Sequence, residues 1–126
     1  MKVADTSYLI EGILRDATLL ENETLVSPDL ALYEVVNALW KHEKLLHDLK
    51  DAQERIDLLS ELVLNGRVQL VRPDGKLLKE TYALSGKYSL AIYDSVFIAL
   101  ALQLKMELAT FDSKQSKVLG EVRRSG

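Results

Sequence analysis

The chain has 126 residues, of which 48% are apolar and 28% charged, and its formal net charge is −3. This balance excludes a disordered chain and predicts a single domain spanning residues 1–126 with a buried core. The chain has no cysteine, which excludes disulfides, thiolate metal sites and a cysteine nucleophile. With no apolar run of signal or membrane-span length either, we expect a cytoplasmic protein. The negative charge argues against binding nucleic acid through a broad basic face.

The first third of the chain predicts two short strands followed by a helix. The apolar segments 2–5 and 25–26 are each typical of a short buried strand. Ser27, Pro28 and Asp29 then predict a helix start, because a hydroxyl caps free N–H groups, proline suits the first helical position and an acid complements the dipole. Apolar residues at spacings of three and four extend this helix to about Lys44.

A second helix and a third strand are predicted in the middle of the chain. The apolar pattern of the first helix returns from residue 48 to 64, so we expect the two helices to form a hairpin. Asn65 and Gly66 end the second helix, and the alternating segment 67–71 predicts a strand. Pro73 predicts the start of a further helix, which is expected to end near residues 85–86.

The last third predicts another helix and a fourth strand. The helix is expected from about residue 90 or 93 to 105, and the strand lies within 106–111. The tail from Ser113 has amphipathic spacing, which leaves a fifth strand open. Because strands alternate with helices, the chain is predicted to have an α/β fold, with a parallel sheet covered by helices on both faces.

Three acidic residues stand where a parallel sheet gathers its ligands, at the carboxyl ends of the strands. Asp5 ends the first predicted strand, Asp112 follows the fourth, and Asp94 lies at the start of the helix before the fourth strand. Glu34 lies about two turns into the helix after the second strand. Asp94 is also the only charged residue between positions 88 and 102.

A carboxylate in an apolar setting is costly unless it caps a helix, joins an ion pair or binds a ligand. Several such carboxylates close together repel one another unless a cation lies between them. Oxygen ligands without cysteine favour Mg²⁺ or Mn²⁺ over zinc. The pattern therefore points to metal-assisted hydrolysis of a phosphodiester bond.

Four segments in order resemble the PIN domain family, which includes the ribonuclease toxins (VapC-like) of toxin–antitoxin pairs. They are ValAlaAspThrSer at 3–7, TyrGluValValAsnAlaLeu at 33–39, TyrAspSerValPheIleAlaLeuAla at 93–101 and LeuAlaThrPheAsp at 108–112. The resemblance covers nearly the whole chain. It implies a three-layer α/β/α sandwich with a four- or five-stranded parallel sheet, and a Mg²⁺- or Mn²⁺-dependent endoribonuclease that acts on RNA. It further implies a small antitoxin partner and a homodimer.

The resemblance also carries site roles onto individual residues. The acidic metal cluster is implied at Asp5, Glu34, Asp94 and Asp112, and supporting polar positions at Thr6, Asn37 and Thr110. Many relatives place another acid shortly after the last aspartate, whereas residues 113–116 contain none. This departure motivates an alternative, a PIN-like protein-interaction or RNA-binding module with little or no nuclease activity.

Structural roles remain open for the same acids. Asp5 and Asp94 are also typical of helix N-caps, Glu34 of a residue paired with Lys41 or its neighbours, and Asp112 of an ordinary turn or cap. A phosphoacceptor receiver domain is a third reading, which the absence of paired acids near the first strand disfavours. The motifs GxGxxG, GxxxxGKS and GxSxG are absent.

Two other groups of residues are expected to have no specific role in the site. His42 and His47 are predicted to lie on a solvated surface rather than to form a metal pair. Tyr8, Tyr33 and Tyr93 are predicted to pack against the core.

Overall fold

Four parallel strands form the sheet of this computed structural model, which describes residues 1–125. The strands are β1 (Lys2–Ala4), β2 (Leu25–Pro28), β3 (Val68–Val71) and β4 (Leu108–Ala109), and their order across the sheet is β3-β2-β1-β4. Val3 lies opposite Val26 on one side and Leu108 on the other. Within residues 1–125 no fifth strand joins this sheet.

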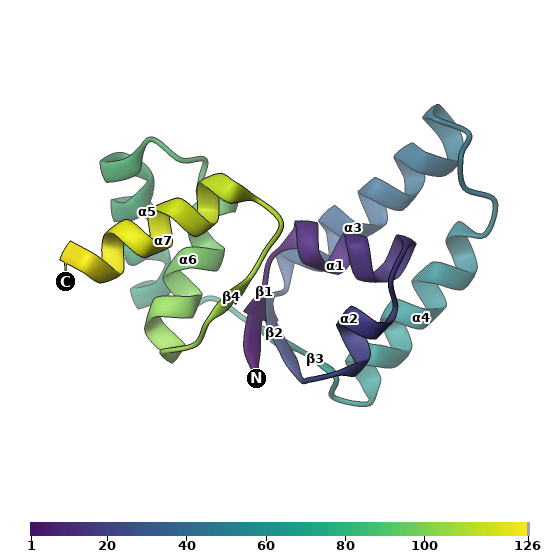
Figure 1. The fold of residues 1–126 in the computed structure, drawn as a ribbon, viewed down its shortest axis with the longest axis horizontal. Coiled ribbons are helices and arrows are strands. Elements are labelled where there is room, and N and C mark those ends of the chain that lie inside the picture. Colours follow the sequence, from purple (N-terminus) through teal and green to yellow (C-terminus); the bar gives the residue numbers. More distant parts are fainter. Residues whose placement is uncertain (126) are drawn as a thin grey trace.

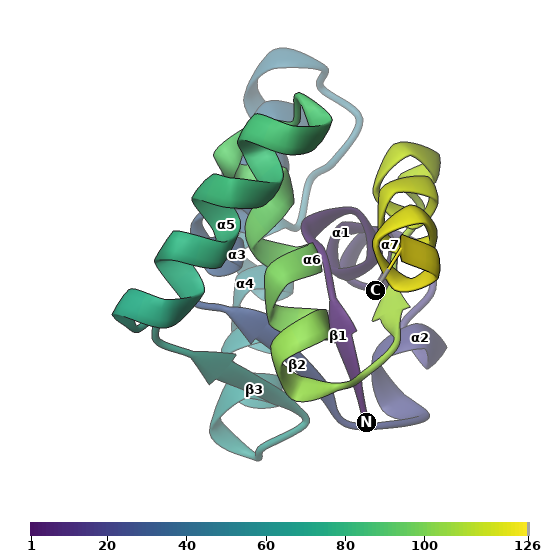
Figure 2. The same cartoon turned by 90° about the vertical axis from the view of Figure 1, so that its left-hand side faces the viewer.

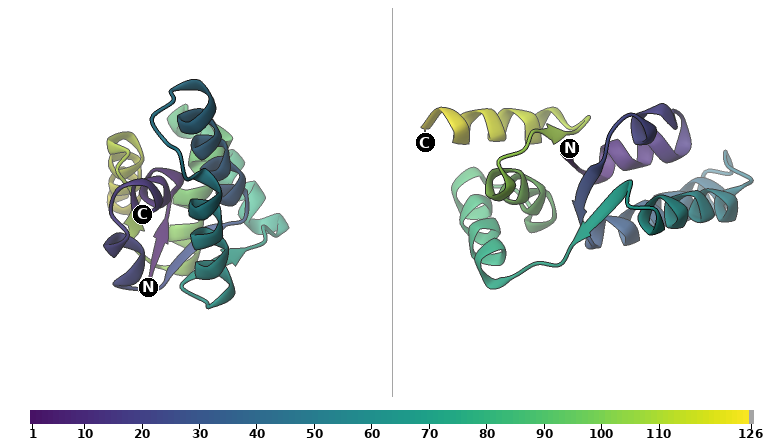
Figure 3. Two further views of the ribbon diagram at one scale, coloured as in Figure 1. Left: turned by 90° about the vertical axis from the view of Figure 1, so that its right-hand side faces the viewer. Right: turned by 90° about the horizontal axis from the view of Figure 1, so that it is seen from below.

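Helices cover both faces of the sheet (Figure 1). One face carries α1 (Thr6–Leu14), α2 (Thr18–Glu21), α3 (Leu30–Trp40), a π-helical turn η1 (Lys41–Leu45) and α4 (Ala52–Leu64). The other side carries α5 (Gly75–Tyr88), α6 (Ile92–Leu104) and α7 (Ser113–Ser125). In the side view α5 and α6 lie in front, and α3 and α4 lie behind (Figure 2). The view from below shows the same separation (Figure 3, right). The prediction of a three-layer α/β/α sandwich is confirmed, with four strands.

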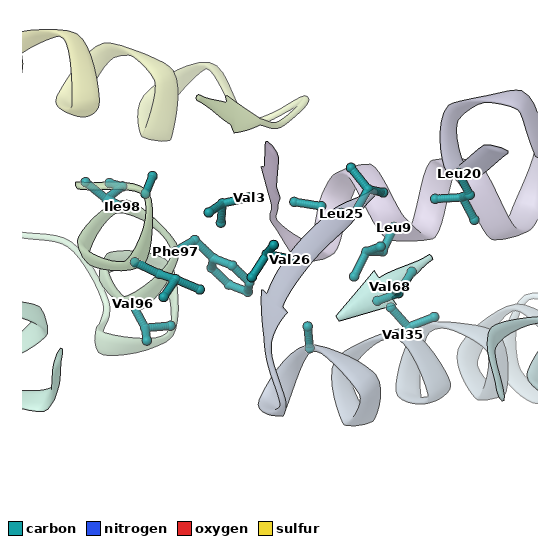
Figure 4. Packing of buried hydrophobic residues seen from close by; sticks show 14 of the residues in the cluster. Val3, Leu9, Leu20, Leu25, Val26, Val35, Val68, Val96, Phe97 and Ile98 are labelled. Atoms are coloured by element: carbon teal, nitrogen blue, oxygen red, sulfur yellow. The ribbon is translucent and has the colours of Figure 1, made fainter. Parts of the chain in front are cut away.

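The core has two parts, one on each face of the sheet (Figure 4). On one side Phe97 of α6 lies against Val3 and Val26, and on the other Leu9 of α1 and Val35 of α3 lie near β2 and β3. All five side chains are at most 4% exposed. Such burial is the main force that fixes the helices on the sheet. None of the helices in residues 1–125 is long and apolar enough to cross a membrane.

The helix start predicted at Ser27 and Pro28 is wrong, because both residues belong to β2. The Ser27 hydroxyl donates a hydrogen bond to the carbonyl of Ala4 in β1 at 2.9 Å, and Pro28 is the last residue of the strand, paired with Val71. Helix α3 begins at Leu30. Pairing with two neighbouring strands therefore outweighs the local preference of serine and proline for a helix start.

Helix α5 also differs from its prediction at both ends. It begins after Asp74, whose side chain accepts from the N–H of Leu77 at 2.8 Å, rather than at Pro73. It continues through Gly86 to Tyr88 instead of ending near residue 85. A glycine inside a helix costs only about 1 kcal/mol, and α5 packs along α6, where the hydroxyl of Ser85 donates to Ser95 at 2.8 Å.

The helical hairpin is confirmed, but its connection is longer than expected. Helix α4 begins at Ala52 rather than near Asp48. Asp48 instead belongs to the connection, where its carboxylate lies 2.8 Å from Nδ1 of His42. His47 has a positive φ of 56° in the same connection and is exposed.

The prediction that the three tyrosines pack against the core holds only for Tyr8. Its ring stacks on Phe111 with the centroids 5.5 Å apart, and its hydroxyl donates to the carbonyl of Leu19. Tyr33 is 80% and Tyr93 65% exposed, so the packing role is wrong for both. The buried faces of α3 and α6 are formed by other residues, such as Val35 and Phe97.

Candidate metal-binding site

The four predicted acids lie around the carboxyl ends of the strands. This edge of the sheet is the upper one in Figure 1. Strand β1 leads into α1 on one face of the sheet, whereas its neighbour β4 is reached from α6 on the other. The chain thus turns to opposite faces at adjacent strands, and parallel sheets bind ligands at such a switch point. Asp5 directly follows β1, and Asp112 follows β4.

Asp5 lies at the centre of the site and is only 1% exposed. Its Oδ1 accepts from the N–H of Tyr8 at 3.0 Å and from the Ser7 hydroxyl at 2.7 Å. Its Oδ2 accepts from the hydroxyl of Thr110. Asp5 is therefore the N-cap of α1, which is the structural role that its sequence left open, although no apolar pattern predicted the helix itself. The capping role uses Oδ1 and leaves Oδ2 directed toward β4.

Glu34 approaches from α3 and is held by the residue that follows Asp5. The Thr6 hydroxyl donates to Oε1 of Glu34 at 2.6 Å, and both side chains are half-buried. Asn37 is exposed, and in the described residues its side chain forms no hydrogen bond with Glu34. Thr6 therefore joins α3 to the end of β1.

Thr110 joins Asp5 to Asp112. Its hydroxyl oxygen donates to Asp5 and accepts from the N–H of Asp112 at 2.8 Å. Oδ1 of Asp112 in turn accepts from the N–H groups of Lys114 at 2.9 Å and Gln115 at 3.3 Å. Asp112 therefore caps the start of α7, which is the structural role that its sequence left open.

Asp94 lies in the first turn of α6 and is half-buried. Its Oδ1 accepts from Nε2 of Gln115 at 3.3 Å. Since the backbone N–H of Gln115 also binds Asp112, this glutamine joins the two aspartates. Through Thr110 and Gln115, Asp5, Asp112 and Asp94 belong to one hydrogen-bond network.

The charge of the four acids is not balanced by basic side chains. Among residues 1–125 none of the four forms a salt bridge with lysine, arginine or histidine, and the hydrogen bonds to their carboxylates come from neutral groups. Carboxylate and amide oxygens without nitrogen or sulfur ligands suit Mg²⁺ or Mn²⁺. The donor set therefore fits a hard divalent cation.

The distances between the acids limit how they can bind one ion together. In the part of the chain that the structure describes, no three acidic or histidine side chains are gathered closely enough to hold one ion. The half-buried Glu34, Asp94 and Asp112 each carry one carboxylate oxygen that the hydrogen bonds above do not use. Binding of an ion therefore requires these side chains to approach one another, which mutual repulsion opposes until a cation is present.

Two residues of the network carried no role in the sequence analysis. Ser7 donates to Asp5 and accepts from the N–H of Phe111 at 3.0 Å, so it fixes β4 to the start of α1. The sequence offered one signal for Ser7, because a serine two residues after a possible N-cap aspartate can donate to that carboxylate. No sequence signal pointed to Gln115, because polar residues are common in an amphipathic segment such as the one from Ser113.

Fold and site together define an α/β protein with an unbalanced acidic cluster at the switch point of a parallel sheet. The model of one family, described as PIN domain, matches residues 2–120. The chain belongs to the PIN domain family. A sequence relative, Ribonuclease VapC3 of Pyrobaculum aerophilum, is 36% identical over 84 residues, which are 67% of this chain. The match spans 63% of that protein's length.

Solved structures share the fold. A crystal structure of a protein from Pyrobaculum aerophilum superposes with a TM-score of 0.75 at 20% identity, covering 93% of this chain and 83% of that one. A toxin–antitoxin complex from Klebsiella pneumoniae gives 0.66 at 16% identity, with 91% and 89% covered. VapC20 of Mycobacterium tuberculosis, described as a sarcin–ricin loop cleaving toxin, gives 0.71 at 12% identity, with 93% and 94% covered.

Proposed function

We propose that this chain is a Mg²⁺- or Mn²⁺-dependent endoribonuclease that hydrolyses phosphodiester bonds in RNA. The observation that carries the proposal is the set of four carboxylates at the switch point, which have no basic partner among residues 1–125. Membership of the PIN domain family and similarity to a protein named a ribonuclease support the same activity.

Each acid has a defined part in this proposal. Asp5, Glu34, Asp94 and Asp112 would hold the cation through their carboxylate oxygens. Thr6 orients Glu34, and Thr110 orients Asp5 and the backbone of Asp112. A bound divalent ion supplies an activated water and neutralises charge on the phosphate. The acidic side chains would hold the ion and the threonines orient the acids, so no side chain needs to attack the phosphate.

Cleavage of RNA by the purified chain tests the proposal. We expect cutting with Mg²⁺ or Mn²⁺ and none with EDTA, and Asp94→Asn should lower the rate by at least about 100-fold, because one anionic ligand is lost. Asp57→Asn is a matched control, since Asp57 is exposed on α4, outside the acidic network. Undiminished cutting by Asp94→Asn, or equal loss in both variants, contradicts the assignment.

We further propose a small antitoxin as a protein partner. A hollow of about 330 Å³ lies between α3 and α4 and is lined almost entirely by apolar side chains, including Leu32, Val36, Ile56 and Leu64. Leu64 is 88% exposed, and exposed apolar patches mark sites of protein association. Co-purification with the product of a neighbouring short gene, lost in Val36→Asp, would support this partner.

We also propose that the chain forms a homodimer and acts in the cytoplasm. Light scattering of the purified chain tests the dimer.

A second candidate function is a PIN-like protein-interaction or RNA-binding module with little or no nuclease activity. It is favoured by the spacing of the acids, since within residues 1–125 no three of them are gathered around one position. Calorimetry with Mn²⁺ at neutral pH separates the two candidates. A binding signal that disappears in Asp94→Asn contradicts the metal-free module, whereas no signal from the unmodified chain contradicts the nuclease.

A further inference from the structure

Gln115 is a buried polar residue between two of the acids. It lies in the first turn of α7 and is 3% exposed. Its Nε2 donates to Asp94 at 3.3 Å, and its backbone N–H donates to Asp112 at 3.3 Å. Among residues 1–125, its Oε1 is buried without any hydrogen-bond partner.

The position of Gln115 on its helix makes this arrangement costly. Val118 and Leu119 follow at spacings of three and four and are also buried, so position 115 belongs to the core-facing stripe of α7. An apolar side chain would satisfy that stripe without leaving a polar atom unpaired. A buried carbonyl oxygen without a donor is unfavourable and calls for a specific explanation.

The orientation of the amide follows from charge. With Nε2 toward Asp94, the amide donates to a carboxylate, whereas the reverse orientation would direct Oε1 at a negatively charged oxygen. Oε1 therefore cannot bond to Asp94 and needs a donor of its own, which the described residues do not supply. Water bound to a cation is such a donor, because the ion polarises its O–H bonds.

We propose that Gln115 is a positioning residue of the acidic site, which holds Asp94 through its amide N–H and offers Oε1 to the hydration shell of the bound cation. This inference rests on the proposed metal-dependent function. It assigns to a residue of this chain the part that a further carboxylate would otherwise take, with one negative charge fewer.

Metal binding by Gln115→Met tests the inference, because methionine has nearly the same shape but neither donates nor accepts comparably. We expect calorimetric Kd values for Mn²⁺ to rise about tenfold, the usual effect of losing a group that orients a metal ligand. The melting temperature without metal should change little, because removal of the unpaired Oε1 offsets loss of the 3.3 Å bond to Asp94, whose half-buried carboxylate water can reach. If Gln115 had only a structural role, Gln115→Met would lower the melting temperature and leave the Kd for Mn²⁺ unchanged.

Gln103→Met is the matched control. Oε1 of Gln103 is also buried without a partner among residues 1–125, but this glutamine borders a hollow between α5 and α6 with Lys76 and Glu80, outside the acidic network. Its substitution should leave the Kd for Mn²⁺ unchanged. An equal loss of affinity in both variants would overturn the inference.

Gln115→Glu is the second variant, and it remains informative if Gln115→Met does not fold. It keeps an acceptor in place of Oε1 and adds a charge, so we expect a lower melting temperature without metal and Mn²⁺ binding at least as tight as that of the unmodified chain. Weaker binding would overturn the role of Oε1. If the unmodified chain binds Mn²⁺ and cuts RNA but Gln115→Met matches it in Kd, only this inference fails. If the unmodified chain does neither, the proposed function fails as well.

Discussion

Substitution of Asp5 separates its capping role from its charge. Asp5→Asn keeps Oδ1, which accepts from the N–H of Tyr8 and the hydroxyl of Ser7, and replaces only the oxygen that accepts from Thr110. Asp5→Ala removes all three acceptor contacts. The two variants therefore differ in the cap, whereas both lose the negative charge.

The structure sets the size of the expected difference. Loss of an N-cap costs about 1 kcal/mol, and a hydrogen bond to a charged group about 1.5–3 kcal/mol. Because Asp5 is 1% exposed, water cannot replace these bonds in full. We expect Asp5→Ala to lower the free energy of unfolding by about 3 kcal/mol and Asp5→Asn by about 1 kcal/mol. For a chain of this size each kcal/mol shifts the melting temperature by about 4 °C.

Thermal unfolding in EDTA, followed by circular dichroism, measures these shifts without metal. We expect about 12 °C for Asp5→Ala and about 4 °C for Asp5→Asn, while both variants lose metal-dependent cleavage. Equal melting temperatures would refute the capping argument. Cleavage by folded Asp5→Asn at the unmodified rate would refute the role of the Asp5 charge.

Three further predictions concern stability, each measured by thermal or urea unfolding. Gly12→Ala should lower the free energy of unfolding by about 1–3 kcal/mol, because the new Cβ would lie 2.5 Å from Cγ of the buried Leu20. An unchanged free energy would mean that α2 moves aside without cost. Ser27→Ala should cost about 1 kcal/mol, since it leaves a β1 carbonyl without its 2.9 Å hydrogen bond, and an unchanged stability would contradict that bond. Tyr33→Ala and Tyr93→Ala should each change stability by less than about 0.5 kcal/mol, because the side chains are 80% and 65% exposed; a loss above 1 kcal/mol would show that they pack.

The sequence alone indicated the alternation of strands and helices and the α/β class, because these depend on local patterns of apolar residues and turn formers. The order of the acids along the chain was equally local information. Asp5, Asp94 and Asp112 were placed at strand ends or helix starts by counting from predicted elements, and the structure has them there. Their roles as metal ligands stay predictions.

Only the tertiary structure decided which local preferences prevail. Ser27 favours a helix cap by itself, but a neighbouring strand offers its hydroxyl an acceptor at 2.9 Å, and the residue joins the sheet. Gly86 lies inside α5 because that helix packs along α6. Both outcomes depend on segments that the local sequence window does not contain.

The joining of the site is likewise a tertiary property. Thr110 is 105 residues from Asp5 along the chain, and Gln115 is 21 residues from Asp94, yet each pair is hydrogen-bonded. The residue types determined what chemistry the site could hold, because carboxylates favour hard cations. Which neutral groups orient those carboxylates was decided by the packing of α6 and α7 and the pairing of β1 with β4, since contacts across the sheet depend on the whole fold.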